Sequence, residues 1–341
     1  SIVNTSIDEI PTIEVDHRVR LDEFFKSKNM EPKVSSIIEL AKESGVNVYP
    51  ISFWDALSNI ADELKRPELS RMTRMFNVLG VSFSLGVLKA PIAPLLESIE
   101  EIFSAKPTIA DLNKKAANFA YNYASAKFSG FNASLNETDK EPNVMLVQGH
   151  QGSALGKMVC GCRFQSYYPI TPASDESEFL ETHEILQVKE DRPGSTTIVQ
   201  TEDEISAIGM AVGASLTGTR SATSTSGPGF SLMAETLGWA GINEVPVVIS
   251  LFQRSGPSTG LPTRQGQDDL LFAINAGHGE FPRIVYASGD VEDSFYDTGK
   301  CFNFADVFQL PVIHILDKFI ASSVVTCNRF EPDLVSIDRG K

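Results

Sequence analysis

The chain has 341 residues, of which 42% are hydrophobic and 21% are charged. This composition supports packed cores in two or three domains, and it excludes a mostly disordered chain or a disulfide-dense mini-protein. The net charge is −15 and no block rich in Lys or Arg occurs, so we expect no nucleic-acid partner. We expect no membrane span either, because no apolar run reaches about 18 residues.

The first part of the sequence indicates a mainly helical region without a catalytic cluster. Its predicted elements are helices over residues 37–42, 95–103 and 111–127 and a strand over 46–51. From Leu69 onward, apolar residues at Met72, Phe76, Leu79 and Phe83 follow in steps of three and four. This spacing predicts one face of a further helix.

Residues 129–142 are polar and rich in turn formers, so we predict a linker over 131–142 between domains at 1–130 and 143–341. Strands and helices then alternate. The predicted strands cover 144–147, 196–200, 221–225, 245–252, 284–286 and 312–315, and the predicted helices cover 202–216, 230–239 and 291–307. This alternation predicts an open parallel α/β sheet, in which ligands bind beyond the carboxyl ends of the strands.

The cysteines do not form a metal motif. Cys160 and Cys162 are close in sequence, but no second pair accompanies them, and Cys301 and Cys327 stand apart. Zinc and iron–sulfur sites need more ligands at fixed spacing. We therefore predict no metal site, small buried thiols and a reducing cytoplasmic location. The first residue is Ser1 and the last residues are polar, so we expect a chain truncated at both ends.

The segment Tyr168–Pro172 is the first candidate for chemistry. Its two prolines hold Ile170 and Thr171 in a stiff, extended conformation. Such a segment fixes the direction of the Thr171 hydroxyl without help from a helix. The alternative is a rigid turn in which Tyr168 packs on the core.

A second candidate lies at the acidic start of the helix predicted over 202–216. Glu202 and Asp203 suit the positive end of the helix dipole. Glu204 shares a face with Ala207, Ile208, Ala211 and Ser215, which is mostly apolar. A carboxyl group on that face would be partly desolvated, and its pKa would be raised. It could share a proton with a ligand nitrogen, or it could be one more acidic helix start.

Two further candidates follow the most apolar strands. Gly227-Pro228-Gly229 comes directly after a strand, and its glycines permit positive φ and close approach to a ligand. Arg254 begins a long polar loop, where a guanidinium can bind a carboxylate through two parallel hydrogen bonds. Many α/β turns resemble the first segment, and Arg254 could instead pair with an acidic residue of this chain.

Taken in order, four segments closely resemble the alpha subunit of 2-oxoacid:ferredoxin oxidoreductases. They are Tyr168–Pro172, Glu202–Glu204, Thr225–Gly229 and Gly256–Thr263. The resemblance covers about residues 144–335. Residues 1–128 resemble, more loosely, the later part of the family's gamma domain, which archaeal two-subunit members fuse ahead of alpha.

The resemblance implies a fold and a set of site residues. Residues 143–341 would be the pyrimidine-binding domain of a thiamine diphosphate site, an open parallel sheet with helices on both faces, preceded by a mainly helical gamma-type remainder. Glu204 matches the glutamate that contacts the pyrimidine ring and activates the cofactor. Thr171 and Arg254 match groups that bind the substrate. The residues implied for the pyrimidine side of the pocket are Tyr168, Pro169, Ile170, Glu204, Ser226, Gly227 and Pro228.

The resemblance also implies a reaction and partners. The family decarboxylates a 2-oxoacid oxidatively with CoA, giving acyl-CoA and CO2, and passes electrons to ferredoxin. This sequence has no Gly-Asp-Gly motif and no cluster cysteines, so Mg²⁺ and a 4Fe–4S cluster are expected in a partner beta subunit. Arg264 is a candidate second cation for 2-oxoglutarate, or a surface charge. The alternatives are a thiamine-dependent decarboxylase or carboligase without iron–sulfur clusters, and a non-enzymatic scaffold.

Overall fold

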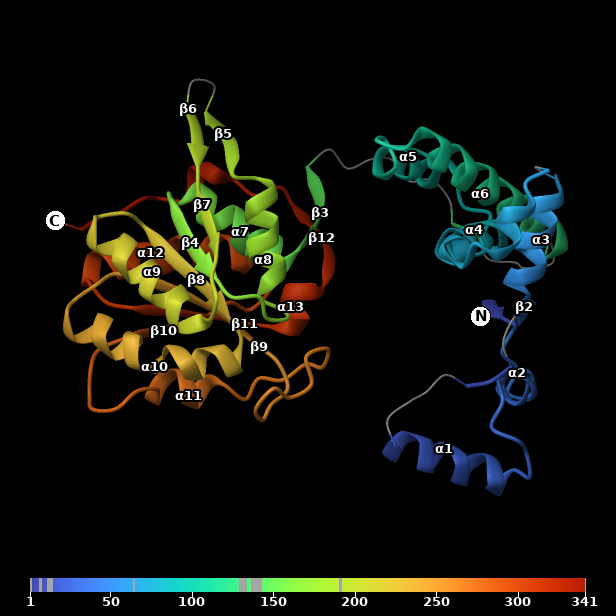
Figure 1. The fold of residues 1–341 in the computed structure, drawn as a ribbon, viewed down its shortest axis with the longest axis horizontal. Coiled ribbons are helices and arrows are strands. Elements are labelled where there is room, and N and C mark those ends of the chain that lie inside the picture. The colour runs from blue at the N-terminus through green and yellow to red at the C-terminus, as the bar shows by residue number, and fades with distance from the viewer. Residues whose placement is uncertain are drawn as a thin grey trace. The chain divides into compact units, whose positions relative to one another are not determined.

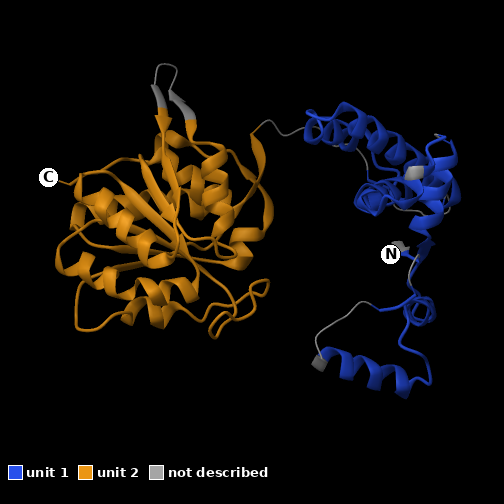
Figure 2. Cartoon of the chain, viewed as in Figure 1, with its two compact units in different colours: residues 1–140 blue, residues 141–341 orange. Residues whose placement is uncertain are grey.

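The chain folds into two compact units, residues 1–140 and 141–341 (Figure 2). The computed structural model describes residues 2–5, 8–10, 15–63, 65–128, 134–135, 143–189 and 192–340. Apart from residues 134–135, the linker predicted over 131–142 lies outside these ranges.

Unit 1 is mainly helical. Its elements are β1 (Ile2–Asn4), α1 (Val15–Ser27), α2 (Val34–Glu43), β2 (Tyr49–Ile51), α3 (Phe53–Glu63), η1 (Pro67–Arg71), η2 (Thr73–Met75), α4 (Phe76–Val87), α5 (Ala93–Ile102) and α6 (Pro107–Lys127). Its core joins α3, α4 and α6, with Leu57, Leu79 and Phe83 fully buried. Gly86 lets α4 approach α6, because a Cβ there would collide with the carbonyl of Tyr121.

The helices predicted over 37–42, 95–103 and 111–127 are confirmed as α2, α5 and α6, and the strand is the shorter β2. The single helix predicted from Leu69 to Phe83 is wrong. Two 3-10 helices, η1 and η2, precede α4, because the backbone leaves the helical region at Met72 (ψ 73°). Met72 is 36% exposed, and Met75 takes the buried place instead.

Unit 2 contains a six-stranded parallel sheet with the order β10-β11-β9-β8-β4-β7 (Figure 1). Its strands are β4 (Phe164–Tyr167), β7 (Thr197–Gln200), β8 (Ser221–Thr225), β9 (Val248–Gln253), β10 (Ile284–Ala287) and β11 (Val312–Asp317). The helices are α7 (Gly149–Val159), α8 (Ser174–Thr182), α9 (Glu204–Leu216), α10 (Gly227–Ile242), α11 (Leu270–Asn275), α12 (Val291–Phe308) and α13 (Lys318–Ser322).

Helices cover both faces of this sheet, as predicted. On one face, Ile208 of α9 and Phe230 of α10 pack against Ile249 of β9. On the other face, Phe302 of α12 packs against Val248 of β9, and α7 and α8 lie beside α12 and β4. Apolar side chains that alternate along β9 therefore supply both cores.

The order of the strands contains one reversal in the direction in which the chain winds. From β4 the chain moves outward to β7, and then returns to β8 on the opposite side of β4. The direction of winding thus reverses between β4 and β8. Ligands of open α/β sheets bind at such a reversal, beyond the carboxyl ends of the strands.

Several strands of unit 2 differ from the expectation. The strand predicted over 144–147 is β3 (Val144–Gln148), but it pairs antiparallel with β12 (Val324–Asn328), outside the main sheet. Its Leu146 is 70% exposed, so an apolar run did not mean burial here. The prediction missed β4, whose buried Gln165 and Ser166 are polar. Their burial depends on hydrogen bonds to α7, α8 and α9, which hydrophobic patterning does not report.

The remaining elements of unit 2 include a hairpin of β5 (Ile185–Lys189) and β6 (Arg192–Ser195), which extends away from the sheet (Figure 1). Cys160, Cys162 and Cys301 are fully buried, as predicted, whereas Cys327 on β12 is only partly buried, which the prediction did not expect. Burial raises the pKa of Cys160 to about 12. No helix in the described part of the chain is both long and apolar enough to span a membrane.

Candidate active site

The predicted site residues lie just beyond the carboxyl ends of four adjacent strands of the sheet. The strands are β9, β8, β4 and β7, in that order. Arg254 follows β9, Ser226 follows β8, Tyr168–Pro172 follows β4, and Glu204 comes four residues after β7. Because the strands are parallel, all four segments start at the carboxyl ends, around the reversal between β4 and β8.

Glu204 is buried at the start of α9. Asp203 caps the helix by accepting a hydrogen bond from the Ser206 backbone N–H at 2.7 Å. Glu204 is only 6% exposed and shares the face of the buried Ala207 and Ile208. Burial raises its pKa, its own backbone N–H lowers it, and the charge of Asp203 raises it further. The partly desolvated carboxyl that the sequence predicts is therefore present.

A glycine in α10 makes room for the Glu204 side chain. A Cβ on Gly229 would lie 2.5 Å from Oε1 and 2.7 Å from Cγ of Glu204. It would also collide with the hydroxyl of Thr225. The predicted close approach is thus real, but it occurs within this chain. Gly227 and Gly229 do not use the positive φ that glycine permits, because both belong to the first turn of α10, which starts earlier than predicted.

Arg254 is buried and is joined directly to the Tyr168–Pro172 segment. Its Nη1 donates to the carbonyl of Thr171 at 2.7 Å, and its Nη2 donates to the carbonyl of Thr259 at 2.7 Å. It is 5% exposed, and its Nε has no hydrogen-bond partner. Burial lowers its pKa, whereas the charge of Asp269 raises it. Both hydrogen-bond acceptors are neutral, so the guanidinium retains a positive charge suited to an anion.

The Tyr168–Pro172 segment presents its polar side chains rather than burying them. Tyr168 is 38% exposed, so the alternative in which this ring packs on the core is wrong. Ile170 makes that contact instead, against Phe252 and Leu316. Thr171 is exposed at the side chain while Arg254 holds its carbonyl. The segment is anchored through its backbone and leaves the hydroxyl free to face a ligand.

Asp269 lies beside the predicted site residues, although the sequence did not single it out. Its backbone N–H donates to Gln253 Oε1 at 2.9 Å. Its Oδ2 lies beside α10, where a Cβ on Gly227 would be 2.8 Å away. Burial raises the pKa of Asp269, the charge of Asp268 raises it further, and Arg254 lowers it. Asp269 is at the far end of the loop from Arg254, and no pattern in the sequence predicts that the two are close in the fold.

Three buried polar atoms at this edge lack a hydrogen-bond partner. They are Ser226 Oγ, Arg254 Nε and Asp269 Oδ2. Such atoms are uncommon in native interiors and call for a specific reason. Their gathering around the start of α10 indicates where a polar ligand can satisfy them.

The loop between β9 and α11 is ordered by its own hydrogen bonds. Ser255 and Leu261 form a β-bridge, and the Ser255 N–H donates to the carbonyl of Arg264 at 3.2 Å. The Arg264 side chain is exposed. Its assignment as a second substrate cation stays a prediction.

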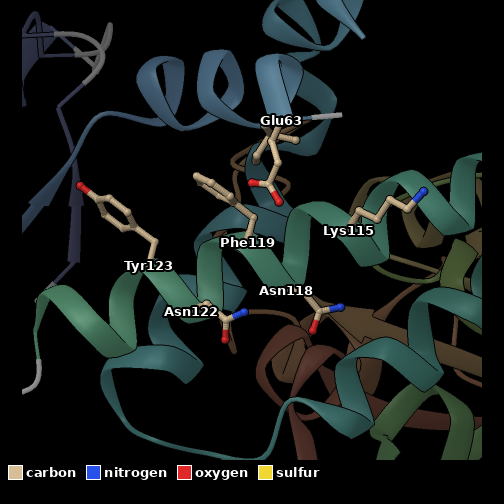
Figure 3. Close-up of a pocket in the computed structure, with 7 residues that line it drawn as sticks. Glu63, Lys115, Asn118, Phe119, Asn122 and Tyr123 are labelled. Atoms are coloured by element: carbon tan, nitrogen blue, oxygen red, sulfur yellow. The ribbon is translucent and has the colours of Figure 1, made fainter. Parts of the chain in front are cut away.

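A separate hollow of about 590 Å³ occurs in unit 1 between α3 and α6 (Figure 3). Ile60, Glu63, Lys115, Asn118, Phe119, Asn122 and Tyr123 line it. None of them belongs to the predicted site, whose residues are all in unit 2. The hollow therefore plays no part in the site described above.

Both units match models of known protein families. A family model described as "Pyruvate flavodoxin/ferredoxin oxidoreductase, thiamine diP-bdg" matches residues 155–338. A second, "Pyruvate ferredoxin/flavodoxin oxidoreductase", matches residues 2–123. Most of unit 2 is thus similar to a thiamine diphosphate-binding domain. The chain belongs to the pyruvate ferredoxin/flavodoxin oxidoreductase family.

Individual relatives agree with this assignment. The alpha subunit of 2-oxoacid:ferredoxin oxidoreductase 1 from Sulfurisphaera tokodaii is 41% identical over 348 aligned residues, covering 100% of this chain and 54% of that protein. The 2-oxoglutarate synthase subunit KorA from Archaeoglobus fulgidus is 41% identical over 51% of this chain and 49% of its own length. The chain spans about half the length of these relatives.

A solved structure is also similar. The 2-oxoglutarate:ferredoxin oxidoreductase from Magnetococcus marinus, with 2-oxoglutarate, coenzyme A and succinyl-CoA bound, has a TM-score of 0.73 and 33% identity. The match covers 87% of this chain and 49% of that one. The resemblance expected from the motifs is therefore confirmed at the level of family and fold.

Proposed function

We propose that this chain is the alpha part of a 2-oxoacid:ferredoxin oxidoreductase. The enzyme would decarboxylate a 2-oxoacid oxidatively with CoA, giving acyl-CoA and CO2, and pass the electrons to ferredoxin. The observation that carries the proposal is the presence of a buried carboxyl, Glu204, and a buried cation, Arg254, on the same edge of the sheet. The family of the chain supports the same reaction.

The residues at the carboxyl ends of these strands fit thiamine diphosphate. The unpartnered Ser226 Oγ can hydrogen-bond to a polar ring, and the glycines of the first turn of α10 leave room for the side chains of Glu204 and Asp269. The wall of the pyrimidine side would comprise Tyr168, Pro169, Ile170, Ser226, Gly227 and Pro228. When bound, the cofactor supplies the nucleophilic carbon for attack on the 2-oxo group.

Glu204 would hold a proton at its carboxyl and share it with a ring nitrogen of the pyrimidine. Burial raises its pKa, which is the direction that favours holding a proton for a ring nitrogen. Gly229 and Thr225 pack against the side chain and fix its direction.

Arg254 and Thr171 would bind the substrate. The buried guanidinium of Arg254 has an unused Nε–H and a positive charge for the carboxylate of the 2-oxoacid. The Thr171 hydroxyl would donate to the substrate, while the carbonyl of the same residue holds Arg254. The two groups therefore position each other, which reduces the entropy lost on binding.

The partner would be a beta subunit that carries the diphosphate and Mg²⁺ motifs and a 4Fe–4S cluster. The outer face of α9 supports a closely packed partner. Gly209 and Gly213 lie one turn apart on it, and no atom of the described residues lies within 4 Å of a Cβ built on either. Ile205, Met210 and Leu216 beside them are exposed. Glycines inside a helix cost about 0.5–1 kcal/mol each, and close helix packing is a reason to retain them.

CoA as co-substrate is supported by the solved relative that has coenzyme A bound. Ferredoxin as acceptor is supported by the names of the relatives. The net charge of −15 is no argument for ferredoxin docking, because ferredoxins are typically acidic too. A cytoplasmic location stays a prediction from the composition.

The test uses the complete alpha chain assembled with its beta subunit under anaerobic conditions. We expect CoA-dependent reduction of a viologen dye with a subset of 2-oxoacids, and iron in the purified complex. CO2 release without dye reduction or iron would instead indicate a decarboxylase or carboligase. The variant Glu204→Gln should lose nearly all turnover, whereas a scaffold would be unaffected by it.

A further inference from the structure

A fully buried ion pair lies in the layer of helices next to the site, and the proposed chemistry does not use it. Lys157 of α7 and Glu176 of α8 are both 0% exposed, and Lys157 Nζ lies 2.6 Å from Glu176 Oε2. Replacing such a pair with apolar side chains is often neutral or even stabilising, because desolvation of the charges offsets their attraction. Stability of the fold is therefore a weak explanation for this pair.

The ion pair is the centre of a hydrogen-bonded cluster. Lys157 Nζ also donates to Gln165 Oε1 at 2.8 Å, and Gln165 Nε2 donates to Ser177 Oγ at 2.8 Å. Ser177 Oγ lies 2.9 Å from Ser224 Oγ. Ser153 Oγ donates to the second carboxylate oxygen of Glu176. The buried polar cluster comprises Ser153, Lys157, Gln165, Glu176, Ser177 and Ser224, each at most 1% exposed.

The members of this cluster stand next to the two site segments. Gln165 is on β4, three residues before Tyr168. Glu176 and Ser177 are in the first turn of α8, directly after the Tyr168–Pro172 segment. Ser224 is on β8, two residues before Ser226. The cluster thus ties together both ends of the substrate segment and the strand that leads into the cofactor turn.

We propose that the buried polar cluster is a positioning device, which fixes the substrate segment Tyr168–Pro172 relative to the cofactor turn Ser226–Pro228. Apolar contacts tolerate sliding, whereas charge-assisted hydrogen bonds have preferred directions and lengths. Lys157 and Glu176 are positioning residues and touch no ligand. Arg254 is included indirectly, because it donates to the carbonyl of Thr171. The role assigned to the two segments rests on the proposed function.

The first test compares two double variants in the complete alpha chain assembled with its beta subunit. Lys157→Met with Glu176→Gln removes both charges at similar volume. The matched control is Arg220→Met with Asp306→Asn, which removes another buried pair, with Arg220 Nε 2.7 Å from Asp306 Oδ2. Arg220 directly precedes β8, at the opposite, amino end of the strands.

We expect the cluster variant to raise the half-saturating concentrations of both the 2-oxoacid and thiamine diphosphate by about 10- to 100-fold, because each ligand would then have to order its loosened segment on binding. The turnover at saturation should change much less. The control should stay within about twofold for both ligands, because its site is distant and independent. Equal effects of the two double variants, or a lowered melting temperature with unchanged half-saturation, would overturn the proposal.

The second test does not depend on the reaction. Hydrogen–deuterium exchange of the same complexes should be faster at Tyr168, Ile170, Thr171 and Ser226 in the cluster variant, and unchanged there in the control. The milder Ser177→Ala keeps the ion pair and removes the two short hydrogen bonds through Ser177, leaving only the longer direct bond from Gln165 Nε2 to Ser224 Oγ at 3.4 Å. Ser177→Ala should also speed exchange at these four residues, but by less than the double variant does. If the double variant does not fold, the exchange of Ser177→Ala tests the proposal. Exchange rates equal to those of the wild-type complex at these residues would overturn the proposal, whether or not the complex oxidises 2-oxoacids.

Discussion

The guanidinium of Arg254 donates a hydrogen bond to the carbonyl oxygen of Thr171 at 2.7 Å, although 83 positions separate the two residues in the sequence. This bond joins the loop after β9 to the segment after β4. The positions of the two groups proposed to bind the substrate are therefore coupled, so a change in one is expected to disturb the other.

Replacing Arg254 with Lys should weaken binding of the 2-oxoacid. A single ammonium cannot bond to the carbonyls of Thr171 and Thr259 and also pair with a carboxylate in the fork geometry of arginine. Loss of one charged hydrogen bond, about 1.5–3 kcal/mol, corresponds to a rise in KM of about 10- to 100-fold. Steady-state kinetics of the assembled enzyme measure it. Arg283→Lys is the control, because Arg283 also donates to a backbone carbonyl but precedes β10 at the amino end of the strands. A KM unchanged in Arg254→Lys would remove this residue from substrate binding.

Replacing Gly229 with Ala should displace the side chains of Glu204 and Thr225. The added Cβ would meet Glu204 Oε1 at 2.5 Å, and the side chain would have to turn away. A misplaced proton-carrying group costs about 100-fold in rate, so kcat should fall by that order. Gly80→Ala is the control, since its Cβ would make only ordinary contact with Phe53 at 3.7 Å. Full activity of Gly229→Ala would show that the direction of Glu204 is not critical.

Replacing Gly209 with Ala should have opposite effects on the isolated chain and on the complex. A Cβ on Gly209 meets nothing within 4 Å in the described structure. The free energy of unfolding of the complete chain without its partner should therefore rise by about 0.5–1 kcal/mol. Affinity for the beta subunit, followed by titration, should fall if a helix packs closely on this face. An unchanged affinity would place the partner elsewhere.

The pH dependence of stability should report the burial of Glu204. Its folded pKa is raised above 4.5 by burial, so the stability that the protonated carboxyl contributes is fully present below pH 4.5. This contribution is lost as the pH rises through the folded pKa. Relative to Glu204→Gln, which does not titrate, the wild-type chain should therefore lose free energy of unfolding between pH 4.5 and the folded pKa of Glu204. Urea unfolding at a series of pH values measures this difference.

Asp203 supplies a control of opposite sign. The hydrogen bond from the Ser206 backbone N–H lowers its pKa below 3.8. The contribution of ionised Asp203 to the free energy of unfolding is therefore present above pH 3.8, and it is lost as the pH falls through the folded pKa. Asp203→Asn should differ most from the wild-type chain at higher pH. Parallel curves for Glu204→Gln and wild-type protein would contradict a Glu204 pKa that burial raises in the folded chain.

Much of the fold could be predicted from the sequence because apolar periodicity reports burial. Ser221–Thr225 was predicted with its correct bounds, and the helices α9 and α12 to within two residues at either end. The face of Glu204 followed from helical spacing alone, since residues three, four and seven positions apart lie together. These features depend on neighbours within one element, which the sequence contains in full.

The rest depended on contacts between residues that are distant in sequence. The polar strand β4 is buried because its Gln165 and Ser166 meet Lys157, Ser177 and Ala207. The partners of Arg254, the approach of Asp269 to Gly227, and the switch of β3 into a separate antiparallel pair likewise appear only in three dimensions. The sequence by itself determined which elements form and which residue types could carry chemistry. Only the tertiary structure decided which polar groups meet, because the hydrogen bonds that permit their burial come from remote strands and helices.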